Sequence, residues 1–72
     1  MKNLADVNVG ESAVVKGLAN DSAVRKRLLE MGVTPGATLK ITGKAQLGDP
    51  IEVLVRGYKL TLRKNEADAI LI

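Results

Sequence analysis

The sequence predicts a mostly β protein, a small closed or nearly closed barrel of about five strands with one inserted helix at about residues 21–31. Apolar and polar residues alternate on both sides of a glycine-containing turn within residues 47–64, which predicts a β-hairpin. The apolar content is almost entirely aliphatic, since Tyr58 is the only aromatic residue, and this composition suits the interior of a narrow barrel. A chain of 72 residues has room for one core, so residues 1–72 are expected to form a single domain.

The hairpin within residues 47–64 has a strongly specified register. With its turn at Arg56-Gly57, six residues fall on one face and form three predicted cross-strand pairs: Val55 with Tyr58, Val53 with Leu60, and Ile51 with Leu62. The other face is polar apart from Leu54. A slip by one residue would bury Lys59 and Arg63 at a large cost in desolvation. Tyr58 is therefore expected to fill the barrel beside the turn, with its hydroxyl at the rim, and Gly57 to supply the turn geometry.

The segment that precedes the hairpin predicts a strand, a helix and a second strand. Residues 4–11 alternate loosely and end in a turn, and residues 12–18 predict the first strand, in which Gly17 marks a bulge or a close backbone approach. Three consecutive candidate N-caps precede the helix, and the sequence does not decide among them: Asn20, Asp21 and Ser22. The second strand is predicted over residues 37–44, with its inner face formed by Ala37, Leu39 and Ile41.

The predicted helix has an apolar stripe and one leucine outside it. At about 100° per residue, three side chains fall within roughly 60° and are expected to pack on the sheet: Val24, Leu28 and Met31. Leu29 lies outside this stripe, beside Arg25 and Lys26. Gly32 is expected to end the helix in a left-handed conformation, with Val33 in contact with Leu28.

The remaining segments are predicted to be turns, a loop and a terminal strand. Pro35 and Gly36 stand at the central positions of residues 34–37, where they predict a type II turn with a structural role for both. Asp49, in the loop over residues 45–50, is expected to order that loop through a bond from its side chain to the backbone. Residues 64–68 predict a short turn or a single 3₁₀ turn, and residues 69–72 predict a terminal strand that closes the sheet edge.

The residue types present argue against catalysis and tight metal binding. The chain has no cysteine and no histidine, so it lacks disulfides, the usual transition-metal ligands and the partners of a nucleophilic serine. Glu66 and Asp68 are close in sequence, but such a pair is usually found as solvated turn residues. No phosphate-binding loop of the GxxxxGK[ST] type is present. We therefore expect a protein without cofactor or metal, which is not an enzyme.

Composition also bears on the compartment and on nucleic-acid binding. Absence of cysteine favours a reducing compartment, and no stretch resembles a signal peptide or a membrane span, so a cytoplasmic protein without membrane insertion is expected. The net charge of +3 is modest and spread along the chain. Small basic barrels can bind nucleic acid, but a single aromatic residue offers little surface for base stacking. Nucleic-acid binding is therefore the alternative function and not the main expectation.

Several short motifs occur together in an order that resembles the FeoA family of bacterial ferrous iron transport. The resemblance covers essentially the whole chain and rests on the combination Leu28-Leu29 with Met31-Gly32, Thr34-Pro35-Gly36, Gly48-Asp49-Pro50, Arg56-Gly57-Tyr58 and Arg63-Lys64. It implies an SH3-like β barrel that works beside FeoB, a membrane iron permease with a cytosolic GTPase domain. The module is also similar to the C-terminal domain of repressors of the diphtheria toxin repressor type, so a free-standing regulatory module of that kind is the alternative.

The resemblance implies a partner-binding surface, which we place on the helix. Leu29 provides an apolar anchor with a charged rim, and the predicted site consists of Arg25, Lys26, Leu29 and Glu30. The competing interpretation is that Leu29 covers the barrel edge under a neighbouring loop. Secondary candidates are Asp49, Lys59 and Arg63. A role as an arginine finger for the partner GTPase has four candidates, Arg25, Arg27, Arg56 and Arg63. The protein is expected to be a monomer or a weak oligomer.

Overall fold

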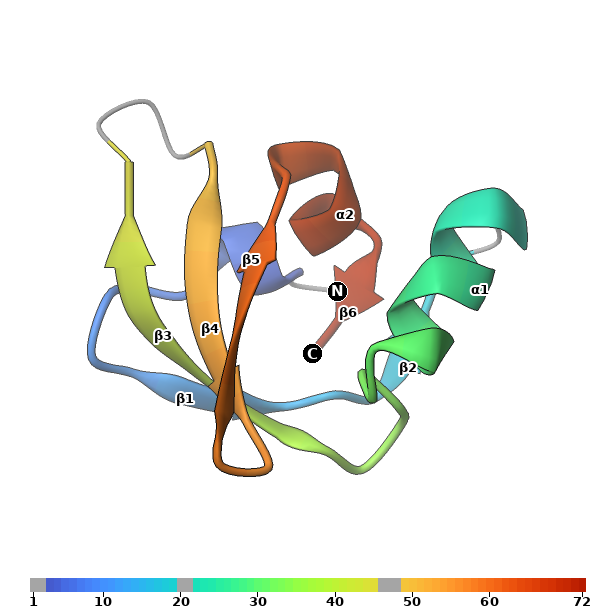
Figure 1. Ribbon diagram of the computed structural model, residues 1–72, viewed down its shortest axis with the longest axis horizontal. Coiled ribbons are helices and arrows are strands. Elements are labelled where there is room, and N and C mark those ends of the chain that lie inside the picture. Colours follow the sequence, from blue (N-terminus) through green and yellow to red (C-terminus); the bar gives the residue numbers. More distant parts are fainter. Residues whose placement is uncertain (1–2, 20–21, 46–48) are drawn as a thin grey trace.

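The computed structural model describes residues 3–19, 22–45 and 49–72. In these residues, strands β1 (Ser12–Val14), β3 (Thr38–Lys44), β4 (Ile51–Val55) and β5 (Tyr58–Leu62) form a four-stranded antiparallel sheet in the order β1-β3-β4-β5 (Figure 1). Strands β2 (Gly17–Leu18) and β6 (Ile70–Leu71) form a second, two-stranded antiparallel sheet. The helices are η1 (Leu4–Asp6), α1 (Ser22–Glu30) and α2 (Lys64–Asp68). The predicted small barrel with an inserted helix is confirmed.

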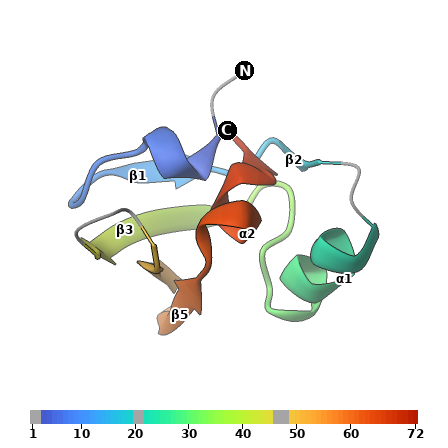
Figure 2. The same cartoon turned by 90° about the horizontal axis from the view of Figure 1, so that it is seen from above.

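The two sheets and the helices enclose one aliphatic core. Its largest fully buried side chains come from η1, α1, β3, β4, β5 and β6, and they are Leu4, Leu28, Leu39, Ile41, Ile51, Leu62 and Ile70. Helix α1 stands beside the barrel, on the far side of β5 from β3, as both cartoon views show (Figures 1 and 2). It contributes Leu28 to the core, and Val24 and Met31 pack against the core while remaining half-buried. The predicted apolar stripe is therefore confirmed.

The hairpin of β4 and β5 has the predicted register. Val55 lies opposite Tyr58, and the next two inward pairs follow, Val53 with Leu60 and Ile51 with Leu62. Arg56 and Gly57 both have positive φ, 50° and 86°, as the two-residue turns that match the twist of a hairpin require.

The prediction for Tyr58 is wrong, because this side chain lies outside the barrel and is 43% exposed. Its hydroxyl instead donates a hydrogen bond to the carbonyl of Met31, at the end of α1. Tyr58 therefore ties the hairpin turn to the helix.

The predicted first strand is wrong as one continuous element. It divides into β1, which pairs with β3, and β2, which pairs with β6. The backbone changes sheets between Val15, whose N–H donates to the Ala37 carbonyl (2.9 Å), and Lys16, whose N–H donates to the Leu71 carbonyl (2.8 Å). Gly17 lies just after this change, and a Cβ built there would meet nothing within 4 Å, so the predicted close approach is absent. The division gives one strand more than expected.

The C-terminal end of α1 has the predicted Schellman geometry. Gly32 has a φ of 87°, and the N–H of Val33 donates to the carbonyl of Leu28 at 2.9 Å. The type II turn is confirmed as well, since Gly36 has a φ of 91° and the Ala37 N–H donates to the Thr34 carbonyl at 3.0 Å. Of the candidate N-caps, Asn20 and Asp21 lie outside the described residues, and so does the side chain of Ser22.

Both short helices near the chain ends depart from expectation. Residues 64–68 form the α-helix α2 rather than a turn, and η1 lies within the segment that was expected to alternate loosely. In η1 the side chain of Asn3 accepts a hydrogen bond from the Ala5 N–H at 3.0 Å, as an N-cap does. Beyond α2, strand β6 pairs with β2 and closes that edge, as predicted for the terminal strand.

Replacing Gly32 by alanine is expected to lower the free energy of unfolding by about 1–2 kcal/mol, because the residue has positive φ. An added Cβ would also lie 2.5 Å from the Tyr58 hydroxyl oxygen. In a Tyr58→Phe background this clash disappears, so the cost of Gly32→Ala should be smaller there. Urea denaturation of the four proteins in this double-mutant cycle measures both terms. Equal costs in both backgrounds would contradict the predicted clash.

Candidate functional site

The outer face of α1 brings the four predicted docking residues together. Arg25, Lys26, Leu29 and Glu30 line one shallow hollow on this face. Leu29 is 38% exposed, although the adjacent Leu28 is completely buried in the core. The helical period of 3.6 residues accounts for the difference, since consecutive residues point about 100° apart. We call this surface, formed by these four residues, the α1 face.

The charged residues of the α1 face do not have equal roles. The guanidinium of Arg25 donates a hydrogen bond to the carbonyl of Leu18 in β2 at 3.3 Å, so it also attaches the helix to the barrel. Lys26 and Glu30 are exposed and form no salt bridge or side-chain hydrogen bond within the described part of the chain. Lys26 is therefore the better position at which to test the charge of the rim, since its replacement does not remove a structural contact.

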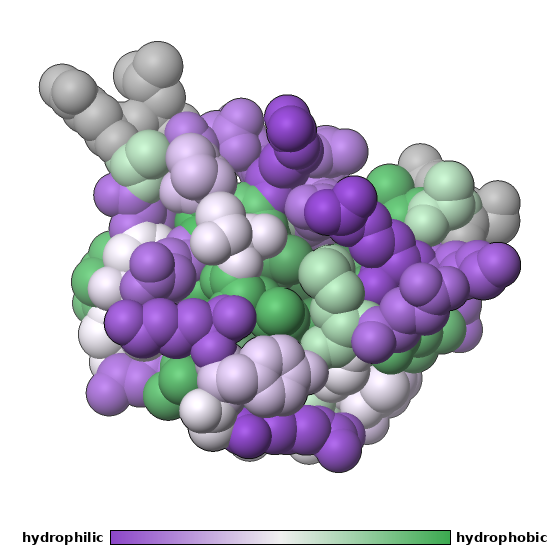
Figure 3. Space-filling view, in the orientation of Figure 1, coloured by the Kyte–Doolittle hydropathy of each residue, from purple (hydrophilic) through white to green (hydrophobic). Residues whose placement is uncertain are grey.

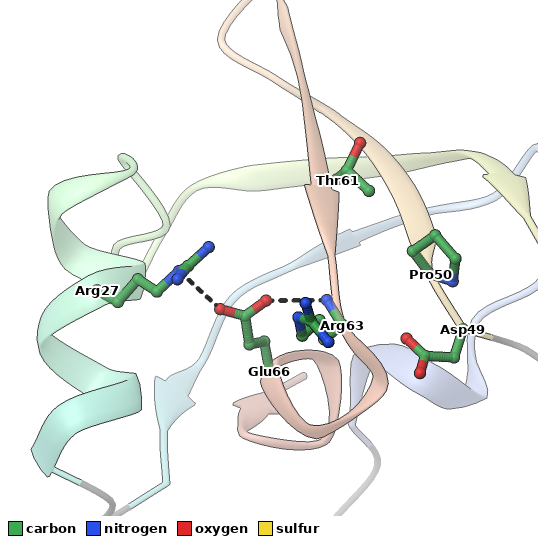
Figure 4. A pocket seen from close by; sticks show the side chains of 6 residues that line it. All are labelled: Arg27, Asp49, Pro50, Thr61, Arg63 and Glu66. Atoms are coloured by element: carbon green, nitrogen blue, oxygen red, sulfur yellow. Dashed lines mark hydrogen bonds and ion pairs between the residues drawn. The ribbon is translucent and has the colours of Figure 1, made fainter.

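A second hollow lies between α1, β5 and α2, and its polar lining was not foreseen as a unit (Figure 4). Its lining residues are Arg27, Asp49, Pro50, Thr61, Arg63 and Glu66. Glu66 is only 4% exposed, so the interpretation of this residue as a solvated turn residue is wrong, whereas Asp68 is exposed as expected. Burial of Glu66 follows from α2, which turns its side chain toward the barrel.

Both carboxylate oxygens of Glu66 have partners. Oε1 accepts a hydrogen bond from the backbone N–H of Arg63 at 2.8 Å, and Oε2 lies 2.9 Å from Nε of Arg27 (Figure 4). The first contact caps the start of α2, and the second joins α2 to α1. Glu66 therefore stabilises the start of α2 and links α2 to α1. No group of three or more potential metal ligands of the His, Cys, Asp or Glu type is present among residues 3–19, 22–45 and 49–72.

Asp49 orders the backbone as predicted, but its partner is distant in sequence. Its Oδ1 accepts a hydrogen bond from the N–H of Lys64, the first residue of α2, at 3.0 Å. The side chain therefore attaches the segment before β4 to the start of α2. This contact gives Asp49 a structural role in the second hollow.

The remaining cationic candidates differ in how strongly the fold holds them. Lys59 lies 3.7 Å from a carboxylate oxygen of Glu52, and both side chains are exposed, so the pair contributes little. Of the four arginine-finger candidates, Arg25 bonds Leu18, Arg27 pairs with Glu66, and Arg56 donates to the Thr34 hydroxyl at 3.1 Å. The guanidinium of Arg63 has no protein partner in the described part of the structure.

Two of the polar contacts that hold α1 and the residue after it, Met31, are not predicted by the sequence. They are the bond from the Tyr58 hydroxyl to the Met31 carbonyl and the ion pair of Arg27 with Glu66. Both join residues far apart in sequence, so no local pattern predicts them. Together with Leu28 in the core, they fix the position of α1 beside β5.

The fold and the site define a class of protein: a small β barrel with one helix beside it, whose outer face carries an exposed leucine with charged neighbours. No helix that the structure describes has the length and apolar character to cross a membrane. Residues 2–72 match the sequence profile of the FeoA domain, and the chain belongs to the FeoA family. This family is associated with ferrous iron transport, and it is not known as a family of enzymes.

Individual relatives agree with this assignment. The chain is 33% identical over 67 residues to a fusion of Fe(2+) transport protein A with Fe(2+) transporter FeoB from Porphyromonas gingivalis; the match covers 93% of this chain but only 8% of the fusion protein. A FeoA-like protein from Clostridium acetobutylicum is 42% identical, with a TM-score of 0.89 over 96% of this chain and 80% of that one. FeoA from Stenotrophomonas maltophilia, solved with zinc and described as an SH3 domain protein, is 27% identical, with a TM-score of 0.86 over 99% and 88% of the two chains. The SH3-like class of the barrel is thereby confirmed.

Proposed function

We propose that this protein is a cytoplasmic accessory subunit of ferrous iron transport, which acts by direct contact with the cytosolic part of a FeoB-type permease. The observation that supports this proposal most strongly is the Porphyromonas gingivalis relative, in which a homologous domain and FeoB are parts of one polypeptide. Domains fused in one protein are often separate, interacting proteins elsewhere, and fusion raises the effective concentration of one for the other. In either arrangement, we expect the surface of the FeoA domain itself to make the contact.

The α1 face is our proposed contact surface. Leu29 leaves apolar area in contact with water, and burial of such area by a partner is favourable by about 25 cal/mol per Å². The surrounding charges can steer the partner and exclude wrong ones. Because α1 is fixed to the barrel by the core, by Arg27 and by Tyr58, the leucine is presented in one orientation. A rigid anchor loses little conformational entropy when it binds.

A binding assay with the purified cytosolic domain of the permease from the same organism tests the proposal. We expect the chain to bind that domain with a measurable affinity, and a difference between the guanine-nucleotide-bound and nucleotide-free states would identify a regulator rather than a scaffold. No binding at about 100 μM of the chain in either state would contradict the proposal. A salt-dependent shift of a labelled oligonucleotide at micromolar protein would instead favour the nucleic-acid-binding alternative.

A further inference from the structure

Strand β5 has a free edge. It pairs with β4 on one side, and in the sheet order it is the last strand. A hairpin with a two-residue turn places its hydrogen-bonded pairs at Val55–Tyr58 and then at every second pair, so the N–H and C=O groups of Lys59 and Thr61 point away from β4. Among residues 3–19, 22–45 and 49–72, no backbone group bonds these outward groups. The edge therefore offers up to four unpaired backbone hydrogen-bonding groups.

The space beside the free edge of β5 is limited at both ends by side-chain contacts and is open to solvent between them. At one end of β5, the hydroxyl of Tyr58 reaches the carbonyl of Met31, and beyond the other end Arg27 of α1 reaches Glu66 of α2. Between them, the space-filling view shows a hollow with apolar surface at its bottom, in the middle of the face on which β5 lies (Figure 3). Leu60 and Met31, from β5 and the end of α1, are half-buried and pack against the core with part of their surface exposed.

Charge along the outer side of the same edge has one sign. Lys59 and Arg63 are exposed on the solvent face of β5, on either side of Thr61. Lys59 has only its loose, exposed contact with Glu52, and Arg63 has no protein partner among the described residues. A strand added beside β5 would place its outward side chains about 5 Å from these residues, where carboxylates are favoured. Its inward side chains would face Leu60 and the hollow, where apolar groups are favoured.

We propose that the free edge of β5 binds an extended segment of a partner protein, as an added antiparallel or parallel strand, and that this segment alternates acidic and apolar residues. Backbone pairing with Lys59 and Thr61 supplies the affinity, while Lys59 and Arg63 select the acidic side chains. The site is distinct from the α1 face, and the inference does not depend on the identity of the permease partner.

A second copy of this chain is a poor occupant of the same edge. If two β5 edges paired antiparallel, a register centred on Lys59 or Thr61 would place Lys59 directly opposite Lys59 or Arg63 of the other copy. A register centred on Leu60 would leave the two Lys59 side chains diagonal to one another. Like charges at such positions destabilise a pair of strands, and lysine on an edge is a common device against self-association.

The experiment uses the full chain, labelled with ¹⁵N, and a short acetylated and amidated peptide of alternating Glu and Val. We expect the peptide to shift the amide signals of β5 and to slow hydrogen exchange at the N–H groups of Lys59 and Thr61 at least about tenfold at saturation. A peptide of alternating Lys and Val is the control and should bind at least about tenfold more weakly. No binding of the acidic peptide at about 1 mM, protection confined to another strand, or slowed exchange at β5 that depends on protein concentration without peptide would each overturn the proposal.

Variants separate backbone pairing from charge. Thr61→Pro removes one outward N–H but no bond of the ladder with β4, so the fold should survive and the Kd for the acidic peptide should rise at least about tenfold. Thr61→Ala keeps that N–H and should leave the Kd unchanged within about twofold. If Thr61→Pro does not fold, the double variant Lys59→Glu with Arg63→Glu gives the second test, since it should bind the Lys-Val peptide in preference to the Glu-Val peptide. An unchanged preference in that double variant would overturn the proposal.

Discussion

Replacement of Leu29 by lysine is expected to weaken the complex with the cytosolic part of the permease by at least about tenfold. The side chain is exposed at the centre of the α1 face, so the substitution removes the proposed anchor and places a charge in the interface. Because Leu29 is outside the core, the melting temperature should fall by less than about 4 °C. Titration calorimetry against the permease domain and thermal unfolding of the free chain measure the two effects.

Two further variants control for this result. Val14→Lys alters another exposed apolar residue, 53% exposed on β1, and should leave binding unchanged. Lys26→Glu reverses a rim charge that the fold does not use and should weaken binding by a smaller factor than Leu29→Lys. Arg25→Glu is less informative, since it also breaks the bond to the Leu18 carbonyl. Unchanged affinity in Leu29→Lys would remove the α1 face as the docking surface, and a loss of more than about 10 °C in melting temperature would show that Leu29 supports the barrel instead.

Replacement of Glu66 by alanine is expected to lower the free energy of unfolding by about 2–3 kcal/mol. The substitution removes the acceptor for the Arg63 N–H at the start of α2 and leaves Arg27 without its partner. Both contacts involve a carboxylate that is almost completely buried, so water replaces them poorly. Chemical denaturation monitored by circular dichroism measures the change.

Neighbouring residues provide matched controls for Glu66. Asp68→Ala removes an exposed acid from the same helix and should change the free energy of unfolding by less than about 0.5 kcal/mol. Arg27→Ala removes only the ion pair, and because the Arg27 side chain is 64% exposed, its cost should be about 1 kcal/mol or less. A loss in Glu66→Ala no larger than in Asp68→Ala would show that the buried carboxylate does not hold α1 and α2 together.

Features governed by local rules were predictable from the sequence. The β4–β5 register follows from alternation and a two-residue turn, and the end of α1 follows from a glycine that can adopt positive φ. Exposure of Leu29 follows from the helical period, although its role in binding stays a prediction. The four residues of the α1 face are therefore recognisable from the sequence as neighbours on one helix surface.

Features governed by contacts between distant segments could not be predicted in the same way. The division of residues 12–18 into two strands depends on which sheet offers the next backbone partner, and that is decided by β3 and β6 together. Burial of Glu66 depends on how α2 lies against the barrel, its ion pair depends on Arg27 of α1, and the hydroxyl of Tyr58 finds its acceptor at the end of α1. Local pattern predicts Glu66 as a solvated acid and Tyr58 as a core aromatic, because neither stretch of sequence shows where α1 lies.

The most direct test of the docking account is to titrate the ¹⁵N-labelled chain with the unlabelled cytosolic domain of the permease and to map which backbone amide signals change. If the α1 face is the docking surface, the largest changes fall at Arg25, Lys26, Leu29 and Glu30, and β1 on the far side of the sheet stays unaffected. Changes confined to other surfaces, or none at saturating permease domain, would contradict it.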